Sequence, residues 1–177
     1  MRKMRVTKYD PMYRNQNGYF TKSEWDSFYD IGKVFEDNQF NISQYIEVEN
    51  SYINAILATM ESNNVQELRV VGLEKKFELN DFNEEITKYK DYYSDEIIKI
   101  FMQIKEGDIL KSRDIAMICR LILREHIWCK LENMPDMYVH FGYDYYMYVG
   151  CVSECEDTIA LIEKMGLYVE EFESPYL

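Results

Sequence analysis

The sequence of 177 residues is poor in the residues that usually separate domains, with only three prolines and seven glycines. No uninterrupted apolar run is long enough to cross a membrane, and no run of signal-peptide length follows the basic start, MRKMR. We therefore expect one globular domain over residues 1–177, made in the cytoplasm and not attached to a membrane.

The short motifs that carry common chemistry are also missing. The chain contains no Walker loop, no GxGxxG and no GxSxG, which are the local signals for phosphate binding and for a nucleophilic serine. Its 32 acidic residues offer no basis for choosing a catalytic pair of carboxylates. We expect no enzyme activity, no catalytic residues and no cofactor.

Positive charge is scarce, because 20 basic residues face 32 acidic ones and leave a net charge of −12. Proteins that bind nucleic acid directly need a basic footprint, and anionic membranes repel acidic proteins. A basic protein partner suits this charge, since opposite net charges accelerate association. Solubility alone would explain the same composition equally well.

Four cysteines occur, and in a cytoplasmic chain of this size they are more often buried thiols than disulfides. His126 and Cys129 lie three residues apart in a predicted helix, and Cys151 with Cys155 forms a C-x3-C pair. Together they have the chemistry of a zinc site, but their spacing matches no strong zinc signature. We predict no metal site, and leave open whether these four residues bind one.

Hydrophobic periodicity and turn residues indicate helices in the middle of the chain and strands towards its ends. Helices are predicted over residues 42–63, 95–105, 113–132 and 154–165, strands over 4–9, 67–73 and 167–172, and a hairpin over 137–150. Residues 10–40 look irregular, and the tail 173–177 looks loose. This order predicts an α+β domain with a mixed, mostly antiparallel sheet of about five strands and helices packed on it.

The segment MYVHFGYDYYMYVG, residues 137–150, is the most unusual part of the chain. With a three-residue loop at 142–144, strand alternation places Tyr138, His140, Tyr146 and Tyr148 on the face opposite the apolar residues. Such tyrosines are either a structural ladder across two strands or an exposed face that binds a protein partner, with Asp144 at the loop.

Two further groups of charged residues have alternative interpretations. The acidic run 78–96, which contains Asp81, Glu84 and Glu85, is either a solvated face or a patch that imitates phosphates in the basic cleft of a nuclease. On the predicted helix 113–132, Arg120, Arg124 and His126 suggest a different function, a small enzyme or ligand-binding domain with an Arg/His-lined pocket, although such arginines usually pair with acids.

Two stretches, KYDPMYRNQNGYFTKSEWDSFYDIG at 8–32 and RLILREHIWCKLE with MYVHFGYDYYMYVG at 120–132 and 137–150, resemble small bacterial immunity proteins. These accompany polymorphic toxins and contact-dependent growth inhibition systems. The resemblance extends from about Tyr9 to Phe172. It implies a cytoplasmic, non-enzymatic inhibitor that binds the toxic domain of a cognate effector, often a nuclease, and it implies no particular site residues.

Overall fold

A computed structural model describes residues 1–75, 79–152 and 156–177, without the side chains of 79–81 and 85. Its main element is a seven-stranded sheet in which every described strand pair is antiparallel. The strand order is β5 (Ile109–Lys111), β4 (Glu67–Lys75), β6 (Ile127–Asn133), β7 (Met137–Phe141), β8 (Tyr146–Cys151), β1 (Arg2–Thr7) and β9 (Tyr168–Glu171). The N-terminal strand therefore lies between two C-terminal strands.

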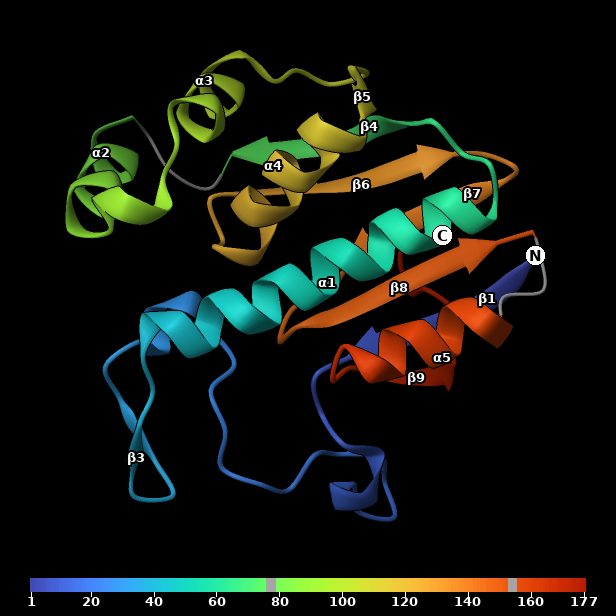
Figure 1. The fold of residues 1–177 in the computed structure, drawn as a ribbon, viewed down its shortest axis with the longest axis horizontal. Helices are drawn as coiled ribbons and strands as arrows, with labels where there is room; N and C mark the ends of the chain where they lie inside the picture. The colour runs from blue at the N-terminus through green and yellow to red at the C-terminus, as the bar shows by residue number, and fades with distance from the viewer. Residues whose placement is uncertain (76–78, 153–155) are drawn as a thin grey trace.

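The helices cover one face of this sheet (Figure 1). The long helix α1 (Ile42–Ser62) lies between α4 (Ser112–Leu123) and α5 (Glu156–Lys164), and α3 (Asp95–Gln103) packs against α4. Helix α2 (Leu79–Lys88) precedes α3. The α+β class is thus confirmed, whereas the sheet has seven strands instead of about five.

Short elements connect these parts. Three 3-10 turns occur in the described chain, η1 (Pro11–Tyr13), η2 (Phe28–Asp30) and η3 (Lys90–Tyr92), together with a small ribbon of β2 (Val34–Phe35) and β3 (Asn38–Gln39). Among the described residues, no helix combines the length and the apolar character that a bilayer span requires.

Helix α1 begins and packs as its sequence indicates. The Asn41 side chain accepts a hydrogen bond from the Gln44 N–H at 3.1 Å, and the Gln44 side chain accepts one from the Asn41 N–H at 3.0 Å. This reciprocal capping box satisfies N–H groups that the first turn leaves unpaired. The buried stripe that follows includes Tyr45, Tyr52 and Ile56 and joins the central hydrophobic core.

The predicted helix over 113–132 is wrong beyond Leu123, where α4 ends and β6 soon begins. The His126 N–H donates to the Leu121 carbonyl and the Glu125 N–H donates to the Ile122 carbonyl, both at 2.9 Å. These are the two bonds of a helix-ending Schellman motif. Pairing of residues 127–133 with β4 and β7 then overrides their helical apolar pattern.

A buried ion cluster lies at the point where α4 stops. The fully buried Glu49 carboxylate of α1 accepts two bonds from Arg124, from Nε at 2.7 Å and from Nη2 at 2.8 Å, and a further bond from Arg120. Arg124 Nη1 also donates to the Tyr92 carbonyl at 2.7 Å. The cluster therefore joins α1, α4 and η3 at one point.

We expect Glu49→Ala to lower the free energy of unfolding by about 3–5 kcal/mol, because it leaves a buried guanidinium without its carboxylate. The matched control is Arg113→Ala, which removes the exposed Arg113–Glu96 pair and should hardly change stability. Urea denaturation of both variants measures the difference. A small effect of Glu49→Ala would show that the cluster does not hold these elements together.

Candidate functional site

The tyrosine face of the hairpin is not the open surface that the alternation suggested. Tyr138, His140 and Tyr148 do share the face opposite the apolar residues, but their exposed fractions are 0%, 1% and 7%. Of the two interpretations, the exposed aromatic face is therefore wrong for these three residues and the structural one fits them, while whether they contact a partner stays a prediction.

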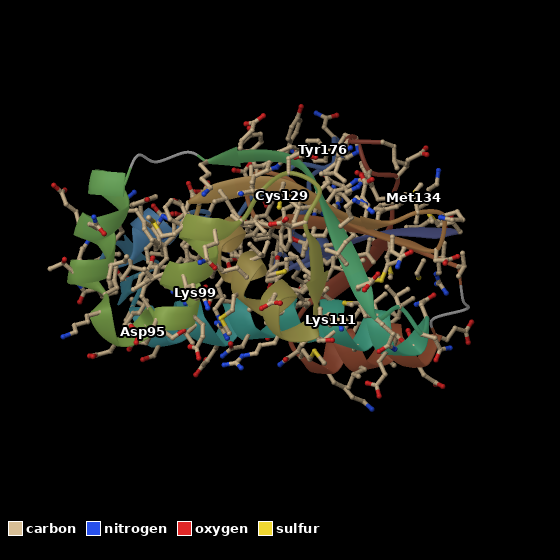
Figure 2. All side chains as sticks on the ribbon, turned by 90° about the horizontal axis from the view of Figure 1, so that it is seen from above. Asp95, Lys99, Lys111, Cys129, Met134 and Tyr176 are labelled. Atoms are coloured by element: carbon tan, nitrogen blue, oxygen red, sulfur yellow. The ribbon has the colours of Figure 1, made fainter. Side chains whose placement is uncertain are left out.

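The C-terminal tail covers this face instead of being loose. Ser174 is buried and its Oγ lies 2.8 Å from His140 Nδ1, while the Tyr148 ring packs between those of Phe172 and Tyr176. Figure 2 shows Tyr176 on the side of the sheet away from α1. The side of the sheet that no main helix covers is thus partly closed by the chain itself.

The hairpin register also differs from the expected one. Phe141 pairs with Met147 and Val139 with Val149, and the ends of β7 and β8 leave a loop of four residues, 142–145, instead of three. Asp144 and Tyr145 both have positive φ angles, 61° and 60°, as in a type I′ turn. The buried Tyr145 holds this turn, because its hydroxyl donates to the Leu123 carbonyl at 2.8 Å.

The other predicted contact residues are only partly brought together. Asp144 and Tyr146 both line a hollow of about 540 Å³ beside the irregular segment. Glu84 is exposed on α2 and is not among the described residues that line this hollow. The side chains of Asp81 and Glu85 lie outside the described residues.

The arginines of the alternative interpretation are occupied by protein groups. Arg120 and Arg124 bind Glu49, and Arg120 Nη2 also donates to Asn50 Oδ1 at 2.8 Å. His126 is buried in the α4–β6 turn, with its Nε2 2.6 Å from the Tyr93 hydroxyl. Burial, and next the charge of Arg124, lowers the pKa of His126 to about 3, so this imidazole is neutral and a poor proton acceptor at pH 7.

A zinc site would have required His126 and Cys129 on one side of a helix, and these two residues do not lie on one helix. No group of three or more potential metal ligands occurs among the described residues. Cys119 and Cys129 are free and buried, and burial raises the pKa of Cys129 to about 12. Cys151 is buried in β8. These thiols are core residues, while Cys155 lies outside the described part of the chain.

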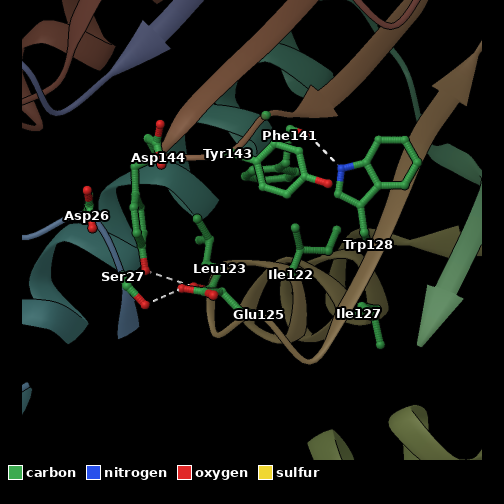
Figure 3. Close-up of a pocket in the computed structure, with 12 residues that line it drawn as sticks. Asp26, Ser27, Ile122, Leu123, Glu125, Ile127, Trp128, Phe141, Tyr143 and Asp144 are labelled. Carbon is green, nitrogen blue, oxygen red and sulfur yellow. Dashed lines mark hydrogen bonds between the residues drawn. The ribbon is translucent and has the colours of Figure 1, made fainter. Parts of the chain in front are cut away.

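A pocket of about 160 Å³ opens where the α4–β6 turn meets the β7–β8 loop (Figure 3). We call it the acidic pocket. Three carboxylates from separate segments line it, those of Asp26, Glu125 and Asp144. Its remaining walls are mainly apolar or aromatic and include Ile122, Leu123, Ile127, Trp128, Phe141 and Tyr143.

Glu125 reaches the pocket because the helix ends in a left-handed residue. Its φ angle is 63°, in a position that normally favours glycine. The Glu125 carboxylate accepts hydrogen bonds from Ser27 Oγ at 2.6 Å and from the Phe28 N–H at 3.3 Å. Ser27 also caps the short turn η2, so the start of η2 is held against the turn between α4 and β6.

The described residues that line the acidic pocket supply no positive charge to balance its carboxylates, although the nearby Lys8 ammonium acts on Asp26. Its described lining contains no lysine, arginine or histidine, and none of its three carboxylates forms an ion pair with another described residue. Burial, with the negative charges of Asp30 and Asp144, raises the pKa of Asp26. The pocket is therefore a place where a cation would be stabilised.

Sequence reasoning missed most of this pocket. Asp144 was expected near a binding face, but Asp26 and Glu125 come from a segment read as irregular and from a predicted helix interior. The sequence did contain a signal for strand β6, because Ile127, Cys129 and Leu131 recur at every second position, and the structure buries all three. No local signal marks the positive φ of Glu125.

The hairpin tyrosines can be tested as structural residues. Gly150 pairs with Tyr138 across the strands, and a Cβ at position 150 would overlap the Tyr138 ring. We expect Gly150→Ala to destabilise the fold by about 1–3 kcal/mol. In a Tyr138→Ala background the same substitution should cost much less, as a thermal or urea double-mutant cycle measures. An equal loss of stability from Gly150→Ala in both backgrounds would contradict the close contact between Gly150 and the Tyr138 ring.

The buried His126 should make the fold sensitive to mild acid. The unfolded chain takes up the imidazole proton near pH 6.5, but the folded chain resists it until about pH 3. Stability contributed by the neutral His126 is therefore complete above pH 6.5 and lost as the pH falls, by roughly 2 kcal/mol at pH 5. His126→Gln should lose less stability than the parent between pH 7.5 and 5. The free energy of unfolding of both proteins is measured by urea denaturation across this pH range. An equal pH dependence in the two proteins would refute the role of His126, since both retain His140.

Comparison with known proteins adds no assignment to this geometry. No protein-family model, no curated protein and no solved structure matches the chain.

Proposed function

We propose that this chain is an immunity protein, which binds the toxic domain of a cognate effector in the cytoplasm and neutralises it. The toxin would be a basic protein, most often a nuclease, and inhibition would follow from covering its active site or substrate face. No catalysis, cofactor or direct nucleic-acid contact is part of this function. The resemblance of residues 9–172 to immunity proteins supports the proposal.

The observation that carries the proposal is the acidic and aromatic end of the molecule. Asp26 and Asp144 line both the acidic pocket and the hollow of about 540 Å³, so the two depressions adjoin. Two tyrosines are exposed beside them, Tyr143 with 68% and Tyr19 with 70% of its surface accessible. Exposed tyrosines next to carboxylates are typical of a surface that binds a basic protein.

The positive side chains near this end of the molecule are also consistent with a cationic partner at the acidic pocket. In the larger hollow, Arg5 and Arg14 are both bound to Glu170, at 2.9 Å and 3.1 Å. The positive side chains of that hollow are therefore partly neutralised, whereas the carboxylates of the acidic pocket are not. Of the two depressions, the acidic pocket is the better match to a cationic partner.

An enzyme or ligand-binding domain built on Arg120, Arg124 and His126 is less well supported. The arginines hold Glu49 and the imidazole is buried against Tyr93. A ligand would have to displace an internal ion pair whose loss destabilises the fold.

Co-purification tests the proposal directly. The chain is tagged and expressed with the protein encoded beside it, and the material that elutes after a salt wash is identified. We expect a stoichiometric complex with a basic domain whose toxicity disappears on co-expression. A toxic neighbour that this chain neither binds nor neutralises would overturn the proposal, as would a harmless neighbour and elution of the chain alone.

One pair of variants then tests whether the acidic end is the contact surface. Tyr143→Ala should weaken the complex by about 2 kcal/mol or more while hardly changing the melting temperature, because the ring is mostly exposed. Leu161→Ala is the control, since Leu161 is an exposed apolar residue on α5. Calorimetric titration of both variants decides: equal affinities would place the interface elsewhere.

A further inference from the structure

We propose that the acidic pocket is a socket for one arginine side chain of the protein partner. The inference rests on the proposed function and adds the chemistry by which the partner is recognised. The occupant is a guanidinium group, which would be enclosed between aromatic walls and carboxylates that come from three separate segments of the fold.

The size of the pocket selects a single side chain. Its volume is about 160 Å³, whereas pockets for cofactors and drug-sized ligands usually span about 300–1,000 Å³. A cavity of about 150 Å³ is known to hold one benzene-sized group. A planar guanidinium with the end of its aliphatic stem is of this order, and a nucleotide is too large.

The walls match the two parts of such a side chain. Ile122, Leu123 and Ile127 offer apolar contact to methylene groups, while Trp128 and Tyr143 offer aromatic faces. A guanidinium stacks on aromatic rings and binds carboxylates through two parallel N–H groups. A lysine ammonium is a compact, strongly hydrated charge and gains less from flat walls.

The carboxylates of the pocket stand out from other acids at the same end. Glu24 pairs with Lys8 and Asp30 pairs with Lys33, each at 2.6 Å. Asp26, Glu125 and Asp144 form no ion pair with a described residue, although the Lys8 ammonium that pairs with Glu24 also acts on Asp26. Hydrogen bonds from Ser27 and Phe28 fix the Glu125 carboxylate in advance, so little ordering is needed when a guanidinium arrives.

The first experiment uses the isolated chain and a model peptide, N-acetyl-Gly-Arg-Gly-amide, followed by nuclear magnetic resonance of the two tryptophan indole N–H groups. We expect saturable binding with a dissociation constant on the order of millimolar that shifts the Trp128 signal, not that of the buried Trp25. The isosteric citrulline peptide, which has no charge, should give no saturable shift.

Charge-matched variants separate the socket from general attraction to an acidic protein. The pocket variant combines Asp26→Asn, Glu125→Gln and Asp144→Asn, and the amide introduced at position 125 keeps an oxygen for Ser27. The control combines Glu61→Gln, Asp157→Asn and Glu163→Gln, which are exposed residues on α1 and α5. The pocket variant should lose the peptide response and the control should keep it. Equal responses would overturn the socket.

The same variants, titrated with the purified partner, distinguish failure of the inference from failure of the proposed function. The pocket variant should bind at least about tenfold more weakly than the control, and one partner Arg→Lys substitution should lose affinity with the parent but not with the pocket variant. A tight complex that both variants form equally well refutes the socket and leaves the immunity function standing. If no complex forms at all, the immunity function fails and the peptide titration alone decides whether the pocket binds arginine.

Discussion

The pair of Glu49 and Arg124 is the contact on which the end of the molecule that holds the acidic pocket depends. Two hydrogen bonds join a fully buried carboxylate to a guanidinium with 1% of its surface exposed. Arg124 is the C-cap of α4, so the pair ties the point where the helix stops, just before β6, to α1. Glu125 and His126 follow immediately in the turn between α4 and β6. Glu125 lines the acidic pocket, whereas His126 is buried in the core.

The acidic pocket is assembled from residues far apart in the chain, and each is held by a different constraint. Glu125 is left-handed and bound to Ser27, while Asp144 lies in a turn that the buried hydroxyl of Tyr145 anchors to α4. Backbone conformations that are unfavourable for residues other than glycine persist only where the surroundings impose them, and they concentrate at functional sites. The same contacts that stabilise the turn therefore also gather negative charge in one place.

For the hairpin tyrosines, strand alternation predicts which face of the sheet each side chain occupies but not whether that face is exposed. Alternation correctly put Tyr138, His140 and Tyr148 on one face. What lies over that face is the tail, through Phe172, Ser174 and Tyr176. The tail is adjacent because β9 pairs with β1, which pairs with β8. Such long-range pairing leaves no trace in the hairpin sequence.

The α+β class, the limits of α1 and α3 and the existence of the hairpin could be predicted from the sequence, because caps, periodicity and turn residues act over a few positions. The excess of acidic residues is a property of the sequence as well. The end of α4 at Leu123, the cover over the tyrosines and the meeting of Asp26, Glu125 and Asp144 at one pocket could not be predicted in this way. They depend on strand pairing and side-chain contacts between distant segments, and such contacts override local preference.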